Sequence, residues 1–242
     1  MRPRKTVTCL AAACSAVFIA AARSGASTIA GPFTVDVGSN TDTYYVLTGD
    51  SGTVYDILQQ DTWTDDQAEA VALGANLITI DSADQNAMVV SDVAQDFTSQ
   101  NGPDLSQVPL WIGLNDEVND PEFGGTDDGP GGTDSQHAAD FTWVDGSTAS
   151  YRNWNVATNE PNDDGGEYYT ALNWHYATGD PTALGTWNDT PNTGTAGYGG
   201  NTGNDTGYFG IAYVPEPATA VLFLGALGLT LKRPASRKKT SS

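Results

Sequence analysis

The sequence predicts an α+β domain in which two helices lie beside an antiparallel sheet. Three observations support this class. Two helical segments with good capping residues come early, several short β-rich segments follow them, and loops rich in Gly, Asn and Asp separate those segments. Helices and strands that are grouped along the chain in this way are typical of α+β domains. No internal repeat of solenoid length is evident in the sequence.

The first half of the domain is expected to contain both helices. Residues 31–62 are predicted to be extended, chiefly 43–47 and 54–58, which are rich in β-branched and aromatic residues. Thr62 is predicted to cap a first helix that runs from Trp63 to about residue 73 and stops at Gly74. Residues 76–80 are predicted to form a short strand, and Ser82 is predicted to cap the second helix.

The second half is expected to consist of strands and long loops. Strands are predicted at residues 110–114, 141–144, 169–174 and 208–214, with another beginning at 185–187. The segments 115–138, 151–169 and 191–207 lack periodicity and are predicted to be loops. The fold class is therefore α+β, with a long irregular region between the later strands.

Both ends of the chain have the composition of targeting segments, so we expect the folded domain at residues 31–213. Residues 1–26 show the basic, apolar and small-residue order of a secretory signal peptide. A membrane anchor is an open alternative, although its apolar run falls short of the ~20 residues that a span needs. A lipoprotein signal at Cys14 is a second alternative.

The segment between the two ends is strongly acidic. Residues 27–213 contain 29 acidic residues and one basic residue, Arg152, which gives a net charge of −28. This charge repels nucleic acid and anionic membranes, disfavours anionic substrates, and suits divalent cations or neutral ligands. Solubility in a salty medium also accounts for most of these acidic residues. Both cysteines, Cys9 and Cys14, lie in the signal segment, so a packed core must stabilise the domain without disulfides.

A series of motifs resembles the C-type lectin-like domain. The series comprises Trp63, Gly74, Leu77, LWIGL at 110–114, FTWVDG at 141–146, Trp154, EPN at 160–162 and WND at 187–189. The resemblance covers about residues 41–213. It implies a double-loop fold in which two helices flank a sheet, the termini meet, and a long second loop carries a calcium and sugar site.

One departure from the family pattern is large. The four conserved half-cystines of the family are absent, and their positions are taken by Ala70, Tyr169, Asn192 and Ala212. The joint absence of all four indicates that packing replaces the bridges, each of which is worth ~2–4 kcal/mol. Tyr169 is expected to compensate in part by burying its aromatic ring.

The resemblance implies a calcium and carbohydrate site built from five side chains that carry oxygen: Glu160, Asn162, Glu167, Asn188 and Asp189. Calcium takes 6–8 oxygen ligands, and in the family a cis proline, here Pro161, orients the first two. Two vicinal sugar hydroxyls would coordinate the ion, and the EPN triplet resembles the version that prefers mannose, glucose or fucose. Asp163 and Asp164 are candidates for an auxiliary calcium site, and an acidic turn without any metal is the simpler alternative.

Residues 214–242 resemble the PEP-CTERM sorting signal of certain Gram-negative bacteria. The sequence VPEP at 214–217 precedes an apolar run at 218–231 and a basic end. The resemblance implies recognition by an exosortase, transient membrane contact through the apolar helix, cleavage near Pro217, and delivery to the outer surface or extracellular matrix. A plain C-terminal membrane anchor is the alternative.

The sequence therefore predicts an exported, calcium-dependent carbohydrate-binding protein that acts in adhesion or in binding extracellular polysaccharide. The alternative, from another class, is a metal-free surface or matrix protein that uses the same fold for protein contacts. An enzyme is not expected, because no nucleophile triad, phosphate loop or zinc spacing occurs. His137 and His175 have no catalytic partner pattern, and the six tryptophans are expected to pack in the core or loops.

Overall fold

The computed structural model describes residues 28–49, 53–95, 105, 108–116, 138–164, 166–195 and 207–213. The predicted signal segment 1–26 and the predicted sorting segment 214–242 lie outside these residues. Most of the two predicted loops at 115–138 and 191–207 also lies outside them.

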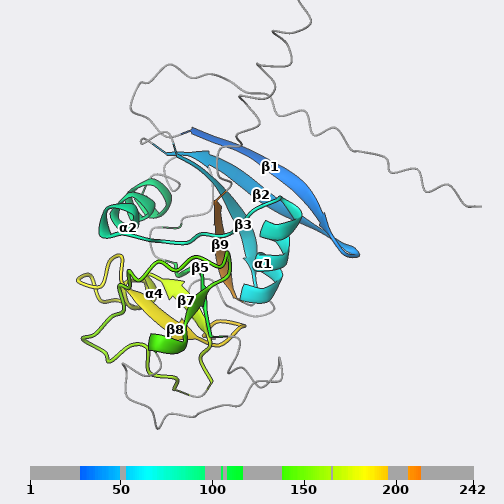
Figure 1. The fold of residues 1–242 in the computed structure, drawn as a ribbon. Helices are drawn as coiled ribbons and strands as arrows, with labels where there is room; N and C mark the ends of the chain where they lie inside the picture. The colour runs from blue at the N-terminus through cyan, green and yellow to red at the C-terminus, as the bar shows by residue number, and fades with distance from the viewer. Residues whose placement is uncertain are drawn as a thin grey trace, which may run out of the picture.

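The described strands form one mixed sheet (Figure 1). Their spatial order is β1 (Thr28–Val37), β2 (Asn40–Thr48), β3 (Val54–Asp61), β9 (Tyr208–Tyr213), β5 (Leu110–Asn115), β7 (Tyr169–Leu172) and β8 (Trp187–Thr190). Two short strands pair beside this path, β4 (Asn76–Leu77) with β9 and β6 (Thr142–Trp143) with β5. The pairs are antiparallel except that β5 and β9 run parallel. The predicted α+β fold class is confirmed.

Both predicted helices begin at the predicted caps. Helix α1 spans Trp63–Ala72, and the Thr62 side chain accepts a hydrogen bond from the backbone N–H of Asp65. Helix α2 spans Ala83–Val89, and the Ser82 side chain accepts in the same way from Gln85. These side chains satisfy N–H groups that the first helical turn leaves without partners. Helix α2 continues directly into a π-helical turn at Val90–Gln95.

Two strands end at least two residues before their predicted ends. The strand predicted at 169–174 ends at Leu172, because Asn173 adopts a left-handed conformation with φ 67° and Trp174–Ala177 forms the short helix α4. The Asn173 side-chain oxygen accepts a hydrogen bond from the N–H of Gly185, which holds this bend. The strand predicted at 76–80 is limited to the two residues of β4.

The core consists of two clusters of buried residues. One includes residues of α2, and the other includes residues of α1. The larger cluster joins α2 to the sheet and contains Ile57, Val89, Ile112 and Trp187. The smaller cluster lies beside α1, which packs against β1, β3 and β9 (Figure 1). The prediction that the tryptophans are packing residues is confirmed for the buried five: Trp63, Trp111, Trp143, Trp154 and Trp187.

Three of the four positions where the family has half-cystines are fully buried in the smaller cluster. Ala70 and Ala212 have no exposed surface there. The ring of Tyr169 is also fully buried, and its centroid lies 4.9 Å from that of Trp63. The predicted packing role of Tyr169 is therefore confirmed.

At the fourth position, Asn192 forms hydrogen bonds that connect the start of α1 to the segment that follows β8. Its backbone oxygen accepts from the N–H of Trp63 at 3.0 Å, and its side-chain oxygen accepts from the N–H of Thr64 at 3.0 Å. Its amide nitrogen donates to the Thr64 hydroxyl at 3.0 Å. Hydrogen bonds thus join the start of α1 to a segment that is more than a hundred residues away in sequence, without a covalent link.

Candidate functional site

The loop that precedes β7 has an unusual backbone around the EPN triplet. The Glu160–Pro161 peptide bond is cis, as the family resemblance implies. Asn159 and Asp163, on either side, adopt left-handed conformations with φ of 66° and 48°. Asn and Asp tolerate this conformation better than other residues with a side chain, which explains their presence at these turns. The backbone N–H of Glu160 donates to the carbonyl of Asn155, which closes the preceding turn.

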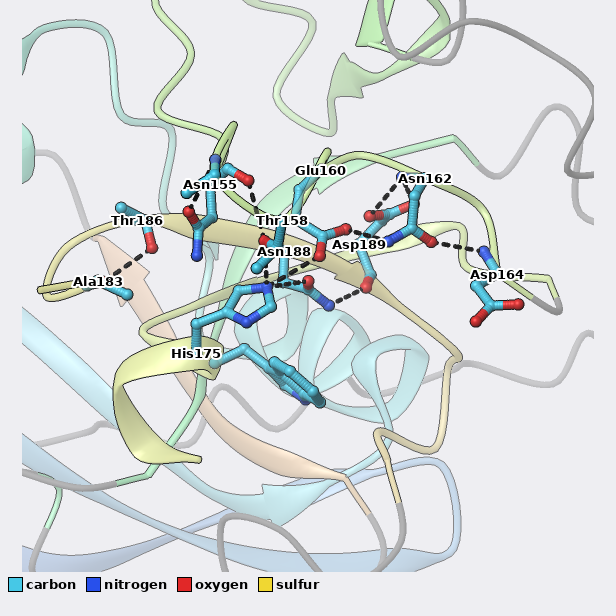
Figure 2. A network of polar contacts seen from close by, with 12 residues as sticks. Asn155, Thr158, Glu160, Asn162, Asp164, His175, Ala183, Thr186, Asn188 and Asp189 are labelled. Atoms are coloured by element: carbon cyan, nitrogen blue, oxygen red, sulfur yellow. Dashed lines mark hydrogen bonds and ion pairs between the residues drawn. The ribbon is translucent and has the colours of Figure 1, made fainter. Parts of the chain in front are cut away.

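Asp189 joins this loop to β8 (Figure 2). The backbone N–H of Asn162 lies 3.1 Å and 3.0 Å from the two Asp189 carboxylate oxygens, and the N–H of Asp163 donates to Oδ2 at 2.8 Å. The Asn162 amide nitrogen donates to Oε2 of Glu160 at 2.6 Å. The structure therefore brings Glu160, Asn162 and Asp189 into direct contact through the cis-proline turn.

Glu167 and Asn188 border this group from two sides. The N–H of Asp164 donates to Oε2 of Glu167 at 3.2 Å, and the N–H of Glu167 donates to Oδ1 of Asp163 at 2.8 Å. The side-chain amide of Asn188 donates to the backbone carbonyl of Asp189. The two candidates for an auxiliary site, Asp163 and Asp164, thus take part in the turn that positions Glu167.

His175 of α4 is a further member of the group that sequence reasoning did not select. Its Nε2 lies 2.9 Å from Oε1 of Glu160 and 2.9 Å from Oδ1 of Asn188 (Figure 2). The Thr158 hydroxyl lies 3.0 Å from the same nitrogen. The signal in the sequence was its position: His175 is the only histidine between the EPN and WND motifs.

The carboxylates of the site are crowded and buried. Burial, together with the charges of Asp189 and Glu160, raises the pKa of the Glu167 carboxyl to about 9. Burial also raises the pKa of Asp189 to about 8, with Glu160 acting in the same direction against the hydrogen bonds from the loop. Negative charge is therefore poorly compensated here, and a cation would relieve it.

The five candidate side chains carry atoms that suit calcium, but in this structure they are not oriented around a common point. Two carboxyl side chains, Glu160 and Glu167, the Asp189 carboxylate, and two amide oxygens are the hard oxygen ligands that calcium prefers. Yet no three His, Cys, Asp or Glu side chains of the described chain are arranged to hold a metal ion. Backbone N–H groups occupy the Asp189 oxygens, and His175 faces Glu160 and Asn188. The five side chains therefore carry suitable ligand atoms for calcium. The imidazole of His175 must turn away from Glu160 and Asn188 before an ion can bind there.

Comparison with known families decides the relationship. The family model described as the lectin C-type domain matches residues 59–194, which is more than half of the chain. The chain belongs to the C-type lectin domain family. This is a family of non-enzymatic binding domains, its members are typically extracellular, and carbohydrate binding is the function that it suggests. No curated protein matches the chain.

Solved structures similar to this lectin domain include three of animal origin. The mouse scavenger receptor C-type lectin carbohydrate-recognition domain has 17% identity and a TM-score of 0.42, covering 69% of this chain and 91% of that one. Herring type II antifreeze protein has 23% identity and a TM-score of 0.40, covering 67% and 92%. The C-type lectin domain of murine dendritic cell inhibitory receptor 2, solved with an N-glycan, has 20% identity and a TM-score of 0.41, covering 67% and 91%.

Within the described ranges, no helix is long and apolar enough to cross a membrane.

We expect the substitution His175→Ala to raise the calcium affinity of the lectin domain about tenfold. Nε2 of His175 contacts two of the predicted ligand oxygens, and a hydrogen bond to a charged group is worth ~1.5 kcal/mol or more. A bound ion must replace that contact. Calorimetric calcium titrations of both proteins measure the effect, with His175→Gln as the matched control that keeps a donor near Glu160. Weaker calcium binding by the alanine variant would instead make the imidazole a supporting part of the site.

Proposed function

We propose that this lectin domain binds neutral carbohydrate through a calcium ion. The proposed ligands and sugar-binding residues are Glu160, Asn162, Glu167, Asn188 and Asp189. The observation that carries the proposal is the direct contact of Glu160, Asn162 and Asp189 across the cis-proline turn, where burial raises the pKa of the Asp189 carboxyl. Calcium binding is common in C-type lectins, and the net charge of −28 favours cations over anionic ligands.

Each residue of the proposed site has a defined role. When bound, the calcium ion would be coordinated by two neighbouring hydroxyls of one sugar ring. The carboxylates of Glu160 and Glu167 accept hydrogen bonds from those hydroxyls, and the amides of Asn162 and Asn188 donate to them. Asp189 holds the loop on β8 through the N–H groups of the turn. A polar site of this kind binds a single sugar weakly, so useful affinity comes from several copies on a surface.

The place of action follows from the two ends of the sequence. Residues 1–26 support export, and residues 214–242 support processing by an exosortase-type enzyme with transient membrane contact. We therefore propose that the protein is presented on the surface, the outer membrane or the extracellular matrix of a Gram-negative-type bacterium. There it would bind glycans or extracellular polysaccharide and contribute to adhesion.

The proposed function is tested by a calcium titration followed by a glycan array. The exported protein is titrated with calcium in a calorimeter and then applied to an array of neutral glycans with and without a chelator. Saturable calcium heat and a glycan signal that the chelator removes are the expected results. Absence of calcium heat together with absence of a chelator-sensitive signal would overturn the proposal and favour a metal-free surface protein.

A further inference from the structure

Two buried carboxyl side chains on α1 leave three oxygen atoms without a hydrogen-bond partner among the described residues. Asp66 and Glu69 are one helical turn apart, and only 0% and 2% of their surface is exposed. Neither carboxyl oxygen of Asp66 has a hydrogen-bond partner among the described residues, and Oε1 of Glu69 has none either. A Cβ built on Gly210 of β9 would lie 2.6 Å from Oδ2 of Asp66, so this carboxyl is packed tightly against the strand.

Among the described residues, no basic group lies on α1 or on the strands that surround this pair. On α1 and the strands around it, the ionisable side chains are acids or phenols: Asp36, Asp42, Tyr44, Tyr45, Tyr55, Asp56, Asp61, Asp65, Tyr208 and Tyr213. Strands β4 and β5, which also contact α1, have no ionisable residue. The only Lys or Arg between residues 24 and 231 is Arg152, whose guanidinium donates to the carbonyls of Phe141, Ala149 and Tyr151.

Ionised carboxylates are therefore disfavoured in this interface. A buried charge without a counter-ion costs several kcal/mol, and the usual relief is neutralisation by a proton. Burial raises the pKa of Asp66 well above its usual range, and the neighbouring acids add to the effect. Burial also raises the pKa of Glu69 to about 8 and that of Asp56, on the facing strand β3, to about 6.

We propose that α1 docks on the sheet as an acid-dependent lock, in which Asp66 and Glu69 are protonated while the helix is docked and lose their protons when it is released. The inference concerns α1 and not the residues of the proposed sugar site, and it does not depend on that function. It has a consequence for the site nevertheless. The first residues of α1 are hydrogen-bonded to Asn192, three residues after Asp189, so release of α1 frees the end of β8.

The sign of the expected pH dependence follows from which state holds the protons. In the unfolded chain, carboxyls titrate near pH 4, whereas the folded domain keeps the Glu69 proton up to about pH 8. The stability that the Glu69 carboxyl contributes to the folded domain is thus fully present below about pH 4, and it is lost as the pH rises to about 8. Over that window, each proton held only by the folded state raises the unfolding equilibrium constant about tenfold per pH unit.

Urea unfolding between pH 4.5 and 8.5 tests the lock. The full chain with chelator present is compared with the double variant Asp66→Asn and Glu69→Gln, whose amides match the protonated acids in shape and donor capacity. Asp81→Asn with Asp140→Asn removes the same number of charges from exposed positions and serves as the control. We expect the buried double variant to weaken the pH dependence of the unfolding constant by about tenfold to a hundredfold per pH unit, and the control to keep the wild-type dependence. The carboxyls of Asp56, Glu167 and Asp189, whose pKa values burial also raises, account for the dependence that remains in the double variant.

Two outcomes would overturn the proposal: a buried double variant with the same pH dependence as the wild type, or a wild type whose stability rises towards pH 8. If the double variant does not fold, hydrogen exchange of the wild type replaces it. The lock predicts that amide protection in α1, corrected for the intrinsic exchange rate, falls between pH 6 and 8.5 by at least tenfold more than protection in α2. Equal changes in the two helices would exclude a lock at α1.

Discussion

The substitution Asp189→Asn is expected to lower the calcium affinity of the domain by about a hundredfold or more. Asp189 supplies one of the three carboxylates of the proposed site, and it also accepts the N–H bonds of Asn162 and Asp163 that hold the loop. Loss of a group that only supports a metal ligand costs 10- to 100-fold in affinity, so loss of a residue with both roles should cost at least as much. Calorimetric calcium titration measures the change.

The acidity of the chain makes a charge-matched control necessary for this prediction. A domain with 29 acidic residues attracts cations at many positions, so weak calcium heat by itself would say little. Asp127→Asn with Asp128→Asn neutralises two acidic residues of the predicted loop 115–138 and should leave the saturable site intact. If this control removes as much calcium binding as the Asp189 variant does, binding is diffuse and the proposed site is wrong.

The substitution Trp187→Ala is expected to destabilise the domain by about 3–5 kcal/mol, and so to lower Tm by roughly 10 °C or more. Trp187 is fully buried, and its ring centroid lies within 6.0 Å of those of Trp143, Tyr151 and Trp154. Its indole N–H donates to the side chain of Asn86 on α2 at 2.9 Å. Truncation leaves a large cavity and removes the donor that Asn86 faces.

Thermal unfolding of Trp187→Ala and Trp187→Phe separates these two effects. The phenylalanine variant keeps most of the ring packing and loses the indole donor with a small part of the ring, so we expect it to cost about 1–2 kcal/mol. A loss of only a few degrees in the alanine variant would show that the cluster repacks and that Trp187 does not anchor β8. Calcium binding should decline with stability, because Asn188 and Asp189 follow Trp187 directly on the same strand.

The helices were predictable because their signals are local. Thr62 and Ser82 each sit immediately before a segment of helical composition, and each side chain accepts the predicted type of backbone hydrogen bond. The strand at residues 110–114 was predictable because it is apolar throughout, which agrees with its burial in the middle of the sheet. A cap or an apolar run does not depend on distant parts of the chain, so tertiary structure seldom overrides it.

Helix α4 could not be predicted for the opposite reason. It has four residues, too few for any helical periodicity, and it depends on the left-handed Asn173, whose side chain is held by Gly185. The position of His175 depends on this helix. Motif spacing identified Glu160, Asn162 and Asp189, which the structure brings together, but it contained no information on a ring that reaches them from a neighbouring element.

The parallel pairing of β5 and β9 has a consequence for how the domain is assembled. Strand β9, the last in the sequence, lies between β3 and β5 in the centre of the sheet (Figure 1). Until residues 208–213 have been released from the machinery that synthesises or exports the chain, β3 and β5 have no common neighbour and the two halves of the sheet remain separate. Pairing between such distant segments makes folding slow and cooperative. The domain should therefore acquire its structure in one late step, after the entire sheet-forming sequence is free.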